Sequence, residues 1–257
     1  MMLGAQRALL PIGGAAAFLL LWEALVRIFH LRAIFLPAPS AIFAEIFASP
    51  GWFAEQTLYT TGITLVGFFV ALVFGVLFAV LITEWKPLER ILFPLFVALN
   101  GVPKVAVAPL FIIWFGTGVE PKIAISFLIA VFAVVIDTAL GLRSVPADTL
   151  DLARVLKGSR LKVLWRMKLY CALPHMFAGL KVAMSLALVG AIVGEFVTSQ
   201  RGLGYVILTA QGSFDTTRVF AAIMILSVLG LLLMSLIDVA ERFALPWRRI
   251  MMRGAGH

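Results

Sequence analysis

Residues 58–82 read LYTTGITLVGFFVALVFGVLFAVLI and contain no charged side chain. A hydrocarbon core about 30 Å thick needs roughly 20 apolar residues per helical span, so this stretch is long enough to cross a bilayer. Its small residues recur at every fourth position, at Gly67, Ala71, Gly75 and Ala79. Such a stripe lets a second helix approach closely where lipid supplies no hydrophobic driving force. The stretch therefore predicts a transmembrane helix that packs tightly against a neighbour.

Apolar runs of similar length recur along the whole chain of 257 residues. They cover residues 9–29, 58–82, 91–115, 123–142, 174–196 and 219–239. The chain is 62% hydrophobic and 13% charged, whereas soluble domains are roughly 45–50% apolar. No alternating segments of the β-barrel type appear. We expect an all-α membrane protein of about six helices, with residues 1–257 forming a single transmembrane domain. The first run is too long for the apolar core of a signal peptide, so we expect an uncleaved span.

Basic residues outside these runs fall mainly on one side of the membrane. The larger group is Arg7, Lys86, Arg90, Arg143, Arg154, Lys157, Arg160, Lys162, Arg166, Lys168, Arg242, Arg248, Arg249 and Arg253. The smaller group is Arg27, Arg32, Lys122, Arg201 and Arg218. The positive-inside rule then places both termini in the cytoplasm of a multi-pass protein. The net charge of +8 is explained by this orientation, and we expect no nucleic-acid partner.

The third run is interrupted by residues that disturb helical hydrogen bonding. These are Pro94, Gly101, Pro103 and Pro109, with the polar Asn100 and Lys104 among them. Broken backbone at membrane depth is tolerated where it is buried in protein or lines a cavity, so the run forms either a structural kink or a pathway element. Glu195, near the end of the fifth run, is either a pathway residue or a carboxylate that reaches the membrane surface. The candidate pathway or gate residues are Asn100, Pro103, Lys104, Pro109 and Glu195.

Two features precede the second run. Glu23 and Arg27 are four residues apart, which predicts a structural ion pair on one helix face. The segment 36–40, LPAPS, stops any helix at its prolines, and we expect Ser40 to cap the next one. The apolar face of that helix fits either the membrane interface or the rest of the bundle.

The longest connection, residues 143–173, is expected in the cytoplasm and is rich in Arg and Lys. Ser144 and Pro146 favour the start of a first short helix, with Leu150, Ala153 and Leu156 as its apolar stripe. Gly158 ends it, and Ser159 is placed to cap a second. Composition alone also fits a solvated loop that only sets the orientation.

Residues 151–160, DLARVLKGSR, followed by Ala172-Leu173-Pro174, resemble the EAA motif of binding-protein-dependent ABC importer permeases. In that family the loop docks on a cytoplasmic ATPase subunit. The resemblance implies that the ATPase-coupling residues are Asp151, Leu152, Ala153, Arg154, Leu156, Lys157, Gly158 and Ser159. Lys157 stands where the family usually has Gly, and Tyr170 stands where it commonly has Pro.

Three further segments resemble the nitrate, sulfonate and taurine branch of these permeases: 36–40, 108–116, and 194–196 with 201–205. The resemblance implies a type I ABC importer permease in the bacterial inner membrane. Its implied partners are two ABC ATPase subunits, a second permease copy (commonly a homodimer) and an external solute-binding protein. The implied solute is a small oxyanion such as a sulfonate, taurine or nitrate, and the alternative is a vitamin precursor of the pyrimidine or flavin type.

Catalysis within the chain is not expected. No Gly-Lys-Ser or Gly-Lys-Thr phosphate loop occurs, so ATP should be bound and hydrolysed by the partner subunits. Cys171 is the single cysteine and the three histidines are far apart in sequence, which predicts no metal site. An ion-coupled secondary carrier remains a second class, although its usual set of membrane acids is reduced here to Asp137 and Glu195.

Overall fold

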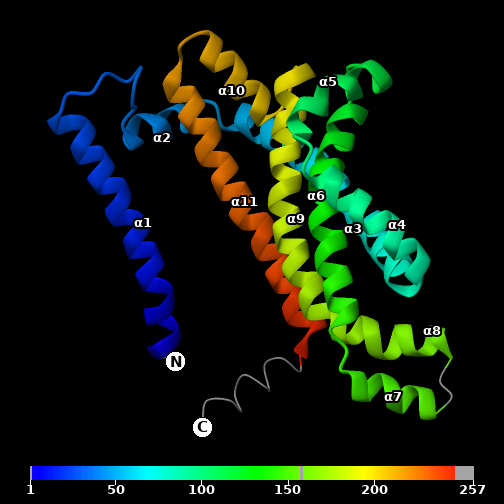
Figure 1. Cartoon of the computed structure of the whole chain (residues 1–257). Helices are drawn as coiled ribbons and strands as arrows, with labels where there is room; N and C mark the ends of the chain where they lie inside the picture. Colours follow the sequence, from blue (N-terminus) through cyan, green and yellow to red (C-terminus); the bar gives the residue numbers. More distant parts are fainter. Residues whose placement is uncertain (1, 157–158, 247–257) are drawn as a thin grey trace. The chain divides into compact units, whose positions relative to one another are not determined.

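A computed structural model describes residues 2–156 and 159–246 of the chain. Every regular element in these ranges is a helix, which confirms the predicted all-α class (Figure 1). The elements are α1 (Met2–Ile28), α2 (Pro39–Ala48), α3 (Pro50–Glu84), α4 (Lys86–Asn100), α5 (Lys104–Phe115), α6 (Glu120–Arg143), α7 (Ala147–Val155), α8 (Arg160–Val163), the π-helical turn η1 (Leu164–Lys168), α9 (Leu169–Thr198), α10 (Leu203–Gly212) and α11 (Thr216–Ala244).

In the described part of the chain, four helical stretches are long and apolar enough to cross a membrane. They are α3, α6, α11 and the continuous stretch from α8 through η1 to α9. The pair α4 and α5 adds a fifth if it forms one span. The expected first span, 9–29, coincides with α1, which is helical but is not among these four. The six predicted runs therefore all correspond to helical segments.

The chain divides into two compact units. The first comprises Met1–Tyr59 and Arg201–Ser227. Within it, the rings of Trp22 in α1 and Phe220 in α11 are 5.7 Å apart. Glu23 and Arg27 form the predicted ion pair at 2.7 Å.

The prediction that Ser40 caps α2 is wrong. Ala38 is the capping residue and Pro39 begins the helix, because proline lacks the amide hydrogen that the first helical turn leaves unpaired anyway. Ser40 instead donates from its backbone N–H and its hydroxyl to the two carboxylate oxygens of Glu23, at 3.0 and 2.8 Å. On the apolar face of α2, Ile42 is fully buried and Phe47 is exposed, so that face packs only in part.

The second unit comprises Thr60–Gln200 and Val228–His257, and α6 and α9 form its main helix pair (Figure 1). A Cβ atom at Gly190 of α9 would lie 2.6 Å from the Cα atom of Ser126 in α6. A Cβ atom at Gly67 of α3 would lie 2.3 Å from the Oγ atom of Ser126. Ser126 also donates a hydrogen bond of 2.9 Å to the carbonyl of Ala187. The predicted small-residue stripe of α3 is thus a packing seam, and three helices meet at Ser126.

The fifth span starts earlier than the predicted residue 174. Helix α8, the turn η1 and α9 follow one another without a break, so the second helix expected in the loop is the beginning of the span. Pro174 lies inside α9 and does not end it. Proline is tolerated in membrane helices because neighbouring helices and local changes of helical pitch satisfy the freed backbone groups.

Candidate transport pathway and coupling loop

The backbone of the third predicted span is broken at one place only. Helices α4 and α5 meet at an angle of 99° across residues 101–103. Val102 precedes Pro103, and the proline ring disfavours the helical conformation for the residue before it. Pro94 and Pro109 lie inside α4 and α5, so these two do not interrupt the chain as expected. The break places Asn100, Pro103 and Lys104 together.

Lys104 lies at the first position of α5, where unpaired backbone N–H groups give the helix end a partial positive charge. Its ammonium group donates to the backbone carbonyl and to the Oδ1 atom of Asn100, both at 2.9 Å. The same group lies 4.6 Å from the centre of the Phe132 ring in α6. These partners are all neutral, so they orient the cation without cancelling its charge.

Glu195 is fully buried near the end of α9, so its carboxylate does not extend to the surface. The Thr60 hydroxyl of α3 donates to it at 2.8 Å, and Thr60 is also fully buried. Thr64 donates in turn to the Thr60 carbonyl at 2.8 Å. Glu195 and Thr60 therefore join α9 to α3, whereas Asn100, Pro103 and Lys104 lie at the break between α4 and α5 and Pro109 lies inside α5.

Helix α7 contains the predicted coupling residues Asp151, Leu152, Ala153 and Arg154. Leu152, Val155 and Leu156 share one side and are 57%, 78% and 72% exposed, whereas Ala153 is buried. Of the predicted apolar stripe, Ala153 is buried and Leu150 is half-buried, whereas Leu156 follows the last residue of α7 and is exposed.

Beyond α7, Ser159 caps α8 as predicted, since the backbone N–H of Lys162 donates to its hydroxyl at 3.4 Å. Lys157 and Gly158 lie outside the described residues, as does the side chain of Arg154.

Ion pairs anchor both ends of the coupling loop. Arg143, the last residue of α6, pairs with Glu89 of α4 at 2.5 Å. Lys168, the last residue of η1, pairs with Glu84 at the end of α3 at 2.6 Å. Sequence reasoning missed these acids because the pairing joins positions 54 and 84 residues apart.

A second set of ion pairs joins α9 to α11. Lys181 of α9 contacts Asp238 and Glu241 of α11, at 2.5 and 2.6 Å. The sequence signal that could have revealed these pairs is a lysine inside the run 174–196 and two acids at the end of the run 219–239, because charges in membrane helices are rarely unpaired.

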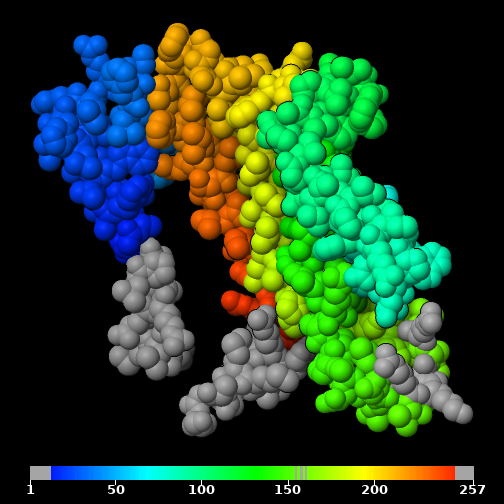
Figure 2. All heavy atoms as spheres, viewed as in Figure 1, coloured from blue at the N-terminus to red at the C-terminus, as the bar shows by residue number. Residues whose placement is uncertain are grey.

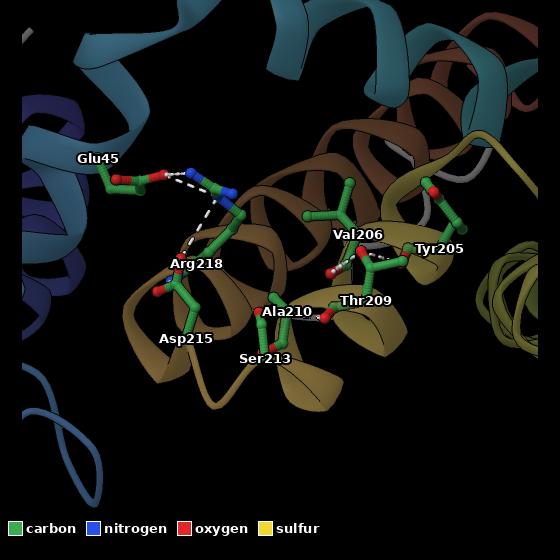
Figure 3. Close-up of polar contacts among 8 residues, drawn as sticks. All are labelled: Glu45, Tyr205, Val206, Thr209, Ala210, Ser213, Asp215 and Arg218. Carbon is green, nitrogen blue, oxygen red and sulfur yellow. Dashed lines mark hydrogen bonds and ion pairs between the residues drawn. The ribbon is translucent and has the colours of Figure 1, made fainter.

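The first unit holds a smaller polar cluster (Figure 3). Arg218 pairs with Glu45 at 2.8 Å and with Asp215 at 3.7 Å. The hydroxyls of Thr209 and Ser213 are satisfied by carbonyls of their own helix, those of Tyr205 and Ala210 among them. In the segment 201–205, Gly202 has a positive φ of 101° and donates to Gln56 at 2.7 Å, so this position requires glycine.

The apolar surfaces of α4 and α5 are open in the single chain. No residue of α4 is buried, and Figure 2 shows the atoms of both helices in full view. The large apolar side chains exposed on them are Ile91, Leu95, Val97, Leu99, Val105, Leu110, Ile113, Trp114 and Phe115. Such a surface is expected of a membrane protein, in which lipid or another subunit covers it.

Several long apolar helices, a broken span and a basic helical loop are the features of a multi-span membrane protein. Residues 71–244 match the model of the binding-protein-dependent transport system inner membrane component, and the chain belongs to this family. It is therefore an inner membrane component of an ABC importer, as the sequence motifs predicted.

Curated relatives cover several solutes. The chain is 34% identical to the riboflavin transport system permease protein RibX of Chloroflexus aurantiacus, over 89% of this chain and 86% of that protein. It is 32% identical to the formylaminopyrimidine transport permease protein ThiX of Halalkalibacterium halodurans, over 90% and 92%. It is 29% identical to the taurine transport system permease protein TauC of Escherichia coli, over 94% and 90%.

The fold also resembles that of a solved importer. An inward-facing structure of the MetNI methionine ABC transporter matches with a TM-score of 0.68 at 17% identity, over 77% of this chain and 98% of that chain. The match confirms the predicted type I importer permease bundle.

Proposed function

We propose that this chain is the permease of an ATP-driven importer in which the loop 143–173 binds cytoplasmic ATPase subunits. The complete transporter then holds two ATPase subunits, two copies of the permease and an external solute-binding protein. Both termini lie in the cytoplasm, on the side to which the positive-inside rule assigns the loop. ATP is bound and hydrolysed by the partners.

The observation that carries this proposal is the exposed apolar face of α7. Leu152, Val155 and Leu156 present apolar surface on a loop rich in Lys and Arg. A face of this kind in the aqueous phase marks a protein interaction site, because its burial stabilises a complex by about 25 cal/mol per Å² of apolar area.

The test is to replace Leu152 and Leu156 with Asp in the tagged chain and to measure how much ATPase subunit co-purifies. We expect most of it to be lost while the variant still accumulates in the membrane. The matched control is Phe243→Asp, since Phe243 is also an exposed apolar side chain at a helix end of the second unit. Retention of the ATPase by the double variant would contradict the proposal.

For the solute, we propose a small oxyanion such as a sulfonate, taurine or nitrate. The charge of Lys104, held by neutral partners at the start of α5, supports this class. The taurine permease among the relatives is consistent with it.

A pyrimidine or flavin precursor is the second candidate. It is favoured by the riboflavin and formylaminopyrimidine permeases, which are at least as similar to this chain. Uptake of taurine and of riboflavin by Lys104 variants distinguishes the two solute classes.

A further inference from the structure

The two ends of the coupling loop contact the two ends of one short turn. This turn, residues 84–89, consists of Glu84 at the end of α3, Trp85 between the helices, and the first residues of α4 as far as Glu89. Arg143, where the loop begins, binds Glu89, and Lys168, near its end, binds Glu84. A movement of the loop therefore acts on this turn from both sides.

Arg143 contacts α4 at two positions. Its guanidinium pairs with Glu89 and also lies 5.2 Å from the centre of the Phe93 ring. Glu89 and Phe93 are four residues apart and so lie on the same face of α4. These contacts fix the first turns of α4, which has no fully buried residue, and Phe96 of the same helix packs against Phe132.

Lys168 pairs with Glu84 at the other end of the turn. Around it, Leu164, Leu142 and Ala172 form a buried cluster against which Val80 of α3 packs. The π-helical turn η1 ends at Lys168, and π-helical turns are frequent at functional sites. The loop end, α6 and α3 are thus fixed to one another beside Glu84.

We propose that the turn 84–89 is a transmission element: through Arg143 and Lys168 it passes movements of the coupling loop into α4, and so to the break at 101–103. Arg143, Lys168, Glu84 and Glu89 are positioning residues for transport. The proposal rests on the proposed binding of the ATPase by the loop. It identifies a route from the loop to the broken span besides the direct continuation into α9.

The competing explanation is that the pairs only stabilise the fold. Exposed ion pairs contribute little to stability, and all four side chains are partly solvent-accessible. A structural role would not make a change at the break depend on ATP. The experiment must therefore measure a conformational change at residues 101–103 themselves.

The experiment uses the full transporter, with Cys171→Ser and Val102→Cys introduced so that one thiol reports on the break. The rate of maleimide labelling is measured with and without ATP plus vanadate, alongside ATP hydrolysis. We expect the parent rate to change about fivefold or more with nucleotide, the scale of a typical coupling free energy. Glu84→Lys and Glu89→Arg should each abolish the change while the ATPase is retained and active.

Exchanging the two charges of each ion pair should rescue the response to nucleotide. Glu84→Lys with Lys168→Glu, and Glu89→Arg with Arg143→Glu, should restore the nucleotide-dependent change. The matched control is the exposed pair of Glu55 and Arg201, 3.9 Å apart in the first unit, for which Glu55→Lys should have no effect. Should Glu84→Lys fail to accumulate, Glu84→Gln is used with the same expectation.

Two results overturn the inference: an intact nucleotide response in the single reversals, or no response in a parent that retains an active ATPase. A parent that retains no ATPase overturns the proposed function instead, so the two failures are distinguishable.

Discussion

The Thr60 hydroxyl donates a hydrogen bond of 2.8 Å to the carboxylate of Glu195, and both side chains are fully buried. A buried carboxylate needs such donors, because leaving it underpaired costs far more than the bond contributes on the surface. The pair ties α3 to α9 within the second unit.

We predict that Thr60→Val lowers the stability of the purified protein by about 1–3 kcal/mol, the range expected when a buried group loses its partner. Thr60→Ser keeps the donor and should cost less. Thermal unfolding in detergent measures both. Thr83→Val is the control, since the Thr83 hydroxyl bonds only to carbonyls of its own helix. Equal stability of Thr60→Val and Thr83→Val would refute the importance of the buried pair.

The close approach of α6 and α9 predicts a strong effect at Gly190. A methyl group there would lie 2.6 Å from the Cα atom of Ser126, so Gly190→Ala must separate the helices. We expect a loss of about 1–3 kcal/mol, as for overpacked cores. Gly62→Ala, in α3, is the control, because a Cβ atom there has no neighbour within 4 Å. That variant should be neutral or slightly stabilising, since alanine favours helix. The midpoint of thermal unfolding distinguishes the two.

The ion pair of Lys181 with Glu241 should contribute more to stability than its ion pair with Asp238. The side chain of Glu241 is 15% exposed and that of Asp238 is 43% exposed, so water screens the second pair more strongly. Double-mutant cycles with Lys181→Met, Glu241→Gln and Asp238→Asn measure the two coupling free energies. We predict a larger value for Glu241, within the range of about 0.5–3 kcal/mol found for contacting residues. The reverse order would contradict the arrangement of α9 against α11.

Lys104 tests the class of solute. If the solute is an anion, Lys104→Met should lower taurine uptake into proteoliposomes about tenfold or more, because a hydrogen bond to a charged group contributes roughly 1.5–3 kcal/mol. Lys104→Arg keeps the charge and should retain more uptake. Riboflavin, which lacks an anionic oxyacid group, should be unaffected by either change. Taurine uptake that is unchanged in Lys104→Met would remove the basis for an oxyanion.

Much of the fold was predictable because lipid imposes strong constraints on sequence. The run 58–82 and the stripe from Gly67 to Ala79 predicted α3 and its tight seam. The prolines and the glycine within residues 94–109 predicted an interrupted third span, but they did not single out the break, which lies at residues 101–103. These features depend on near neighbours in sequence, which a single chain displays directly.

The parts that were missed depend on distant partners. Ser40 has the right chemistry for a helix cap, but Glu23 competes for both of its donors, and Pro39 begins the helix instead. The ion pairs of Glu84 and Glu89 join sites far apart in sequence, so nothing in the local pattern selected their partners. On α7, Leu150 and Ala153 are buried in part or in full as predicted, but Leu156 follows the last residue of the helix and is exposed.

The most direct test of the account is to purify the tagged chain gently from its native membrane, identify the co-eluting proteins by mass spectrometry and assay ATP hydrolysis. We predict that an ATP-binding-cassette subunit co-elutes with active hydrolysis, and that it is lost when residues 151–159 are scrambled. A stable chain recovered without any ATPase partner would contradict the importer account.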